Sequence, residues 1–296
     1  MPIEMHRGGP VTRCRWRRIH DGGQMKTVAK AHQGGSAPAA LTGKTLLVIP
    51  TYNEAGNIER LLRQIPAAEC GLDLLVIDDN SPDGTGALVE ALADRLPVRV
   101  MHRPAKLGIG SAHKAGFRYA LEHSYGCVMT MDADFAHAPS DLASMLACAD
   151  HADVVIGSRY LSGGGLTDWP LWRRVVTHTA HWLTTHLLGL PYDCTGGFRL
   201  YDTAVFEQVN LEAIHSDGYA FLTELLFTII RQGFTVHELP IVVTFREHGT
   251  SKISPIEILK AVKTLIQLSC RRVHRKVRTV VPRESRTDLV YEPRNR

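Results

Sequence analysis

Short apolar runs alternate with helix-like segments through the first half of this chain, and this alternation restricts the possible fold more than any other feature of the sequence. The runs are four or five residues long and begin at Thr45, Asp73, Val98, Cys127 and Asp153. Their length and branched side chains are typical of strands buried on both faces of a parallel sheet. Strands that alternate with helices predict an α/β fold with a mostly parallel central sheet and helices on both faces.

The pattern changes along the chain and divides it into four regions. Residues 1–42 mix arginine, glycine and alanine without a period, so we expect a disordered basic extension. Residues 43–254 should form the main domain, in which two long helices, at about 170–189 and 218–232, precede a strand over 236–245. An amphipathic helix is expected over 255–270, and a basic tail over 271–296.

The composition limits the class of protein. The net charge of +4 on 296 residues is too small to indicate nucleic-acid binding. Six cysteines without a C-x-x-C pair favour a reducing compartment. The arginine-rich start lacks the apolar segment of a secretory signal, although an organelle transit peptide is an alternative. No segment reaches the ~20 apolar residues that a spanning helix needs, so we expect a cytoplasmic protein at the membrane surface.

Polar clusters follow the predicted strands, where open parallel sheets bind their ligands. Asp132 and Asp134 stand one residue apart directly after the fourth strand. Two carboxylates there are costly unless a cation or hydrogen-bond donors compensate them, and oxygen ligands suit Mg²⁺ or Mn²⁺. Capping of a following helix is the alternative. After the second strand, the carboxylate of Asp79 could accept hydrogen bonds from a base or a ribose, whereas Asp78 is expected to be structural.

Seven ordered motifs carry a resemblance to a family. They are P-T-Y-N-E at 50–54, V-I-D-D-N-S-P-D-G-T at 76–85, K-L-G-I-G at 106–110, M-D-A-D at 131–134, I-G-S-R-Y at 156–160, T-G-G-F-R at 195–199 and R-E-H-G-T-S-K at 246–252. Over residues 45–268 the chain resembles the dolichyl- or polyprenyl-phosphate mannose synthases, which are inverting GT-A glycosyltransferases.

The resemblance implies a role for each matched residue. Pro50, Tyr52 and Glu54 would contact the donor nucleoside, with Ile77 and Asp79 beside the base. Asp132, the backbone of Ala133 and Asp134 would hold the metal and the diphosphate. Arg159, Arg246 and Lys252 would bind phosphate and, with Asp134, form the catalytic set. Arg199 and Ser251 would lie on the acceptor side. This chain has Phe135-Ala136 where relatives often carry leucine and then serine or glutamine, so His137 or water would have to complete the metal's ligands.

Two basic residues at the start of a predicted helix have two interpretations. Arg173 and Arg174 follow a Trp169-Pro-Leu-Trp172 segment. They could meet the lipid phosphate near the membrane, with the tryptophans at the interface. They could equally form an ordinary basic first turn. His178 and His181 share a helix face and are expected to be surface or packing residues rather than metal ligands.

The implied reaction transfers mannose from GDP-mannose to a polyprenyl phosphate with inversion. A phosphomonoester has a second pKa of about 6, so the acceptor is already ionised and needs no general base. The alternatives are a glucosyltransferase that uses UDP-glucose and a non-catalytic sugar-nucleotide-binding protein. A dinucleotide-binding oxidoreductase is excluded because His113 replaces the third glycine of the fingerprint that would begin at Gly108. A processive polysaccharide synthase is excluded because the chain lacks a Q-x-x-R-W segment.

The last two regions predict an association with membranes. Apolar residues from Ile256 to Leu268 form a wide helix surface, and Arg271, Arg272, Arg275, Lys276 and Arg278 follow it. Each basic residue near an anionic leaflet contributes about 1 kcal/mol. The apolar helix face could either pack on the catalytic domain or enter the membrane. An anchoring partner protein in the membrane is also possible.

Overall fold

A computed structural model describes residues 15–21, 24–30, 44–218, 220–245 and 255–270. The chain divides into two compact units, residues 1–40 and 41–296. In the first unit β1 (Arg15–Asp21) and β2 (Gln24–Lys30) pair antiparallel. The expectation of disorder throughout 1–42 is therefore corrected for these strands. The register pairs Asp21 with Gln24, and the two intervening residues are glycines, a common sequence for a hairpin connection.

The second unit is built on a seven-stranded sheet in the order β10-β7-β9-β6-β3-β4-β5. Its strands are parallel except β9, which runs antiparallel to both β6 and β7. Their bounds are β3 (Thr45–Thr51), β4 (Leu72–Asp78), β5 (Val98–His102), β6 (Cys127–Thr130), β7 (Val154–Ser158), β9 (Arg199–Asp202) and β10 (Val236–Pro240). The five predicted strands of the first half are confirmed, whereas β9 was not foreseen.

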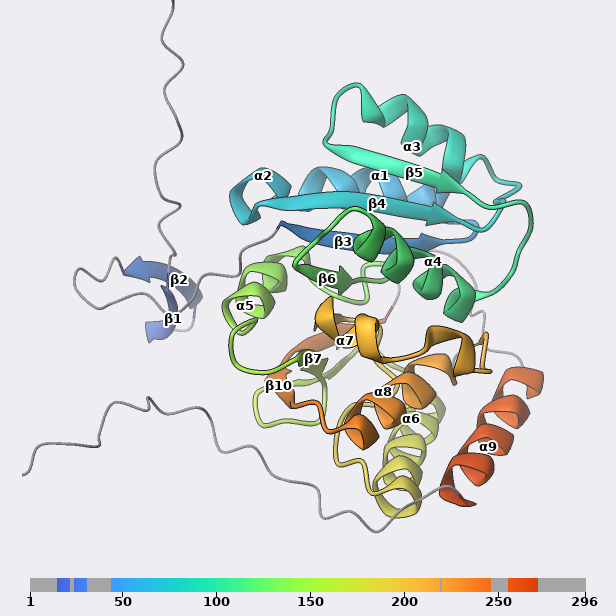
Figure 1. The fold of residues 1–296 in the computed structure, drawn as a ribbon. Coiled ribbons are helices and arrows are strands. Elements are labelled where there is room, and N and C mark those ends of the chain that lie inside the picture. Colours follow the sequence, from blue (N-terminus) through green and yellow to red (C-terminus); the bar gives the residue numbers. More distant parts are fainter. Residues whose placement is uncertain (1–14, 22–23, 31–43, 219, 246–254, 271–296) are drawn as a thin grey trace, which may run out of the picture. The chain divides into compact units, whose positions relative to one another are not determined.

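Helices cover both faces of this sheet (Figure 1). They are α1 (Ala55–Gln64), α2 (Ala67–Cys70), α3 (Thr85–Ala93), α4 (Ile109–Glu122), α5 (Leu142–Ala147), α6 (Leu171–Leu183), α7 (Ala204–Gln208), α8 (Phe221–Gln232) and α9 (Pro255–Cys270). One π-helical stretch, η2 (Thr184–Leu188), continues α6, and two short 3-10 helices, η1 (Pro139–Asp141) and η3 (Leu211–Ala213), precede α5 and follow α7. The predicted mostly parallel α/β fold is confirmed.

Successive side chains of the central strands enter different cores. Leu46 and Val48 of β3 pack on one face with α4, α7 and α8, whereas Leu47 and Ile49 pack on the other with α1, α3 and α5. All four side chains are fully buried. A strand buried on both faces needs apolar residues at every position, which explains the unbroken apolar runs in the sequence.

The strand predicted over 236–245 divides between two sheets. β10 pairs with β7 in the main sheet, and β11 (Val242–Thr244) pairs with β8 (Gly165–Thr167) in a separate two-stranded sheet. Ile241 lies between them, where its N–H donates to the carbonyl of Ser158 at 3.0 Å. Phe245, directly after β11, contacts Trp169 and Arg173 of α6.

The helix α9 packs beside α8 and η2 (Figure 1). Only part of its apolar surface is covered, because Leu265 and Leu268 are buried whereas Leu259 and Ile266 are 69% and 56% exposed. The wide apolar face predicted for this helix is therefore divided between the core and the surface. Among the described residues, no helix combines the length and the apolar character that crossing a membrane requires.

Candidate active site

The carboxyl ends of the central parallel strands bring the predicted motifs together. The register pairs Thr51 of β3 with Asp78 of β4 and Val48 of β3 with Thr130 of β6. The residues after these strands therefore start from one edge of the sheet. Because β9 is antiparallel, its amino end reaches the same edge, where Phe198 accepts a hydrogen bond from the N–H of Gly157 at 2.9 Å. This edge is the candidate site.

A cavity of about 510 Å³ opens beside β3 and β4 at this edge. At its wall, Lys106 Nζ lies 4.0 Å from the centre of the Tyr52 ring. Three of the predicted donor residues, Pro50, Tyr52 and Asp79, line it. The other lining residues are Thr51, Lys106, Leu107, Gly108, Ile109, Ala112, Asp217, Gly218, Glu257 and Lys260.

Asp79 is fixed in the wall of this cavity by two partners. Arg103 Nη1 lies 2.7 Å from Asp79 Oδ1, and the N–H of Gly108 donates to Oδ2 at 2.9 Å. Burial raises the pKa of Asp79, and the charge of Arg103 offsets this only in part. Gly108 has a φ of +93°, and a Cβ there would meet the carbonyl oxygen of Asp217 at 2.8 Å, so the turn requires glycine. Arg103 was not singled out from the sequence.

Two predicted nucleoside contacts lie elsewhere. Ile77 is fully buried in the core and packs against Gly116, so its side chain does not line the cavity, and its predicted place beside the base stays a prediction. Glu54 is 7% exposed, stands before α1 and accepts a hydrogen bond from Asn57 Nδ2 at 2.8 Å. It does not belong to the residues lining the cavity.

The two carboxylates of the predicted metal site follow β6. The Asp132 side chain is 33% exposed, and Asp134 is 9% exposed. Asp134 Oδ1 accepts from the N–H of Ala136 at 3.2 Å, and Phe135 between them has a φ of +61°. Ala133 is buried in the core. Two carboxylates held on a short turn at the sheet edge offer the oxygen donors that a hard divalent cation needs, so the residues fit such an ion.

His137, which the sequence suggests as a further metal ligand, lies next to Asp132. It is 3% exposed, its ring stacks on Phe198 with centroids 5.2 Å apart, and Nδ1 lies 3.8 Å from Asp132 Oδ2. This nitrogen has no hydrogen-bond partner among the described residues. The imidazole therefore supports the carboxylate from within the protein.

Arg159 is held by a residue that the sequence analysis did not select. Its Nε donates to Asp193 Oδ2 at 2.8 Å, and the Asp193 side chain is fully buried. The N–H of Gly196 donates to Asp193 Oδ1 at 3.0 Å. A Cβ on Gly197 would lie 2.8 Å from Asp132 Oδ1. The loop after Asp193 thus packs against the carboxylate and the cation together, and its only sequence signal was an acidic residue two positions before T-G-G-F-R.

Arg199 does not lie on an acceptor surface. The whole residue is inaccessible to solvent, and its guanidinium donates to the backbone carbonyls of Asp193, Cys194, Gly196 and Leu222 at 2.8–3.2 Å. Its side chain is therefore not exposed to an acceptor, and the predicted place of the T-G-G-F-R segment near the acceptor side stays a prediction. Three of these carbonyls belong to the loop after Asp193 and the fourth to α8, so Arg199 holds the loop against the helix and satisfies buried carbonyls that would otherwise lack a hydrogen bond.

Of the remaining predicted site residues, the structure describes only Arg173 and Arg174. Arg173 is 6% exposed and lies 5.1 Å from the centre of the Phe245 ring. Arg174 donates from Nε to the carbonyl of Trp169 at 3.1 Å. These contacts favour a local structural role for both, and acceptor binding by them stays a prediction. Arg246, Ser251 and Lys252 lie outside the described residues.

A family model described as glycosyl transferase family 2 matches residues 46–209. The chain belongs to glycosyl transferase family 2. The matched range begins at β3 and includes the strand-end clusters around Asp79, Asp132 and Arg159 as well as the Asp193 loop. Four residues that line the cavity, Asp217, Gly218, Glu257 and Lys260, lie beyond the matched range.

Two curated proteins are similar to this chain over most of its length. The polyprenol monophosphomannose synthase of Mycolicibacterium smegmatis is 43% identical over 245 residues, which cover 80% of this chain and 92% of that protein. The undecaprenyl-phosphate mannosyltransferase of Micrococcus luteus is 39% identical over 213 residues, covering 71% of this chain and 88% of that protein.

A solved structure supports the fold. Glucosyl-3-phosphoglycerate synthase from Mycobacterium tuberculosis, in complex with Mn²⁺, UDP-glucose and phosphoglyceric acid, superposes with a TM-score of 0.58 at 20% sequence identity. The superposition covers 81% of this chain and 85% of that one. At this identity the likeness supports the GT-A-like architecture alone.

Proposed function

We propose that this chain transfers a mannosyl unit from GDP-mannose to a polyprenyl phosphate, with inversion at the anomeric carbon. The main support for this proposal is the similarity, at 43% and 39% identity over most of the chain, to two proteins named for polyprenyl-phosphate mannosyl transfer. The site supports the proposal because a cavity for a nucleoside and a carboxylate pair occupy one sheet edge.

In this proposal each described group has a separate task. The cavity lined by Tyr52 and Asp79 holds the nucleoside, and Asp132 and Asp134 hold a divalent cation. That ion would neutralise charge on the leaving nucleoside diphosphate. Arg159, positioned by Asp193, adds a fixed positive charge for phosphate, and Arg246 and Lys252 are proposed to add two more. Fixed cations of this kind stabilise a transition state without reorganising as charge develops.

The acceptor supplies its own nucleophile. A phosphomonoester oxygen, ionised above a pKa of about 6, attacks the anomeric carbon from the side opposite the diphosphate. The bond from carbon to the diphosphate oxygen breaks as the new carbon–oxygen bond forms, so the α-linked sugar becomes β-linked. No protein general base is needed, which agrees with a site composed of carboxylates for a cation and arginines for phosphate.

We further propose that α6, η2 and α9 present the site to a lipid surface. Large apolar side chains on these adjacent elements are exposed to solvent, with Leu171 79%, Trp172 63% and Leu259 69% exposed. The others are Val175, Val176, Trp182, Leu187, Ile258, Val262 and Ile266. A lipid acceptor explains such a surface, and the basic residues that follow α9 in the sequence would favour an anionic leaflet at the cytoplasmic face.

The experiment is a donor and acceptor comparison with the purified chain. GDP-mannose, UDP-glucose and UDP-galactose are each incubated with one short polyprenyl phosphate and Mn²⁺ or Mg²⁺, and the lipid product is quantified. We expect GDP-mannose to be used fastest and chelation of the ion to stop transfer. Preference for UDP-glucose would replace mannose by glucose in the proposal. Donor binding without any transfer or hydrolysis would indicate a non-catalytic sugar-nucleotide-binding protein.

A further inference from the structure

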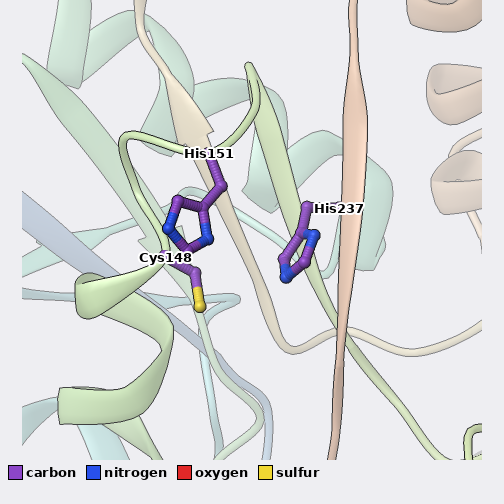
Figure 2. Close-up of side chains that lie close together, drawn as sticks. All are labelled: Cys148, His151 and His237. Carbon is purple, nitrogen blue, oxygen red and sulfur yellow. The ribbon is translucent and has the colours of Figure 1, made fainter. Parts of the chain in front are cut away.

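A second group of possible metal ligands lies at the other end of the sheet. Cys148, His151 and His237 each offer one donor atom, and these atoms all lie within 4.8 Å of one another. Figure 2 shows the three side chains turned toward a shared space. Among the described residues, none of the three side chains makes a hydrogen bond or an ion pair. The rings of His151 and His237 contact each other.

Local structure explains why the first two donors share a side. Cys148 ends α5, and the N–H of His151 donates to its carbonyl at 2.9 Å. This tight turn brings the two side chains onto one surface. Cys148 is 9% exposed, so its sulfur lies at the base of the group, while His151 lies at the surface.

The third donor comes from a strand more than eighty residues along the chain. His237 belongs to β10, the edge strand, and its register partner on β7 is Val155. The ring centroids of His151 and His237 are 5.3 Å apart at an interplanar angle of 82°. Arg159 follows the carboxyl end of β7 at Ser158, whereas His237 pairs near the amino end, so the group is separate from the candidate active site.

We propose that Cys148, His151 and His237 bind one borderline-soft transition-metal ion of the Zn²⁺ class. A thiolate with two imidazoles suits such an ion, whereas Mg²⁺ and Mn²⁺ prefer the oxygen donors of Asp132 and Asp134. Tetrahedral Zn²⁺ places sulfur and nitrogen ligands about 3.3–3.7 Å apart, so the three donor atoms would move roughly 1 Å closer to one another on binding. The exposed His151 side chain can supply that movement. Water takes the fourth position.

Binding has a defined structural consequence. The ion would join the turn after α5 to the edge strand β10, which the main sheet holds on one side only. Binding releases the proton of the Cys148 thiol to solvent, because the sulfur coordinates the metal as a thiolate. Because a bound ion stabilises only the folded state, saturating Zn²⁺ should raise the unfolding temperature by roughly 5–10 °C.

The test uses the full chain, stripped of metal and then supplied with excess Mg²⁺ to occupy oxygen sites. Co²⁺ is titrated in as a spectroscopic probe for Zn²⁺, because a thiolate ligand gives a charge-transfer absorption that carboxylates do not. We expect one equivalent to bind with this absorption and with the visible bands of a tetrahedral ion. Zn²⁺ should displace it, and the melting temperature should rise.

Variants separate the site from incidental binding. Cys148→Ser should abolish the charge-transfer absorption, and His151→Ala and His237→Ala should each weaken Co²⁺ binding at least about tenfold. His151 is exposed, so its replacement leaves packing intact even if Cys148→Ser disturbs the fold.

Cys270→Ser and His123→Ala change exposed residues outside the group and should behave as wild type. Lack of stoichiometric binding, or full affinity in His151→Ala, would overturn the proposal. Mannosyl transfer with Mg²⁺ is measured separately, so the two proposals fail independently.

Discussion

Arg159 and Asp193, thirty-four positions apart in the sequence, form a buried pair in which Nε donates to a carboxylate oxygen at 2.8 Å. The Arg159 and Asp193 side chains are 8% and 0% exposed. The same carboxylate accepts the N–H of Gly196, whose loop packs near Asp132. The position of Arg159, the proposed phosphate-binding cation, is thereby linked to the position of Asp132, a proposed metal ligand.

Removing the negative charge of this pair should damage both stability and turnover. Asp193→Asn leaves Arg159 buried without its counter-charge, a change that costs about 3–5 kcal/mol in comparable pairs. We expect the free energy of unfolding to fall by that order and kcat to fall more than tenfold. Glu212→Gln, which alters an exposed ion pair with Arg118, is the matched control. Unchanged kcat in folded Asp193→Asn would mean that the pair does not position Arg159 for the reaction.

The stabilisation from Asp193 should depend on pH in a definite direction. Burial by itself raises the pKa of this carboxyl group, but the guanidinium groups of Arg159 and Arg199 outweigh burial and bring the pKa below its ordinary value. The contribution to stability is therefore complete above the unfolded pKa of about 4 and is lost as the pH falls through the lower folded value. Urea unfolding of wild type and Asp193→Asn at several pH values should show their difference shrink below about pH 4. A difference that is constant over this range would contradict the assignment.

Loss of one carboxylate after β6 should stop catalysis without unfolding the protein. Asp134→Ala removes a proposed cation ligand at the sheet edge, so transfer should fall by far more than tenfold while the circular dichroism spectrum and melting temperature stay close to wild type. Glu122→Ala, an exposed carboxylate at the end of α4, should keep full activity. A variant that retains more than about a tenth of wild-type turnover, a loss under ~1.4 kcal/mol, would refute the metal role.

The wall of the nucleoside cavity offers a test of donor binding. Arg103→Ala leaves the buried Asp79 carboxylate without its ion pair, so the carboxylate should become protonated or move. We expect the Kd for GDP, measured by calorimetry, to rise about tenfold or more, with a smaller change in kcat at saturating donor. Arg95→Ala replaces an exposed arginine at the end of α3 and should not change the affinity. Equal Kd values for wild type and Arg103→Ala would exclude this cavity as the nucleoside site.

The exposed apolar surface should determine binding to lipid. Replacing Trp172 and Leu259 together by serine removes two of its most exposed members, so co-sedimentation with liposomes containing anionic lipid should fall severalfold. Val242→Ser, on the separate sheet of β8 and β11, is the control because Val242 is also exposed. High salt, or neutral residues at 271–278, should weaken binding further. Binding that survives all of these changes would point to an anchoring partner protein.

Much of the fold and part of the site followed from local patterns. Apolar runs bounded by polar turns define buried strands wherever they occur, so β3, β4 and β6 were predictable from composition and length alone. The rule that open sheets bind ligands beyond their strand ends then selected Tyr52, Asp79, Asp132 and Asp134, which the structure places at one edge. Each of these inferences uses residues that are neighbours in the sequence.

Only the tertiary structure decided what the remaining polar residues do. The role of a charged side chain depends on partners that are distant in sequence, and no local period reports them. Arg199 and Arg159 look alike in their motifs, yet one satisfies backbone carbonyls in the interior and the other pairs with Asp193. Ile77 and Asp79 are two residues apart, but the strand directs one into the core while the other lies beyond the strand end in the cavity wall. The antiparallel insertion of β9 between β6 and β7 creates the difference between the two arginines, because it brings the Asp193 loop to the edge where the parallel strands end.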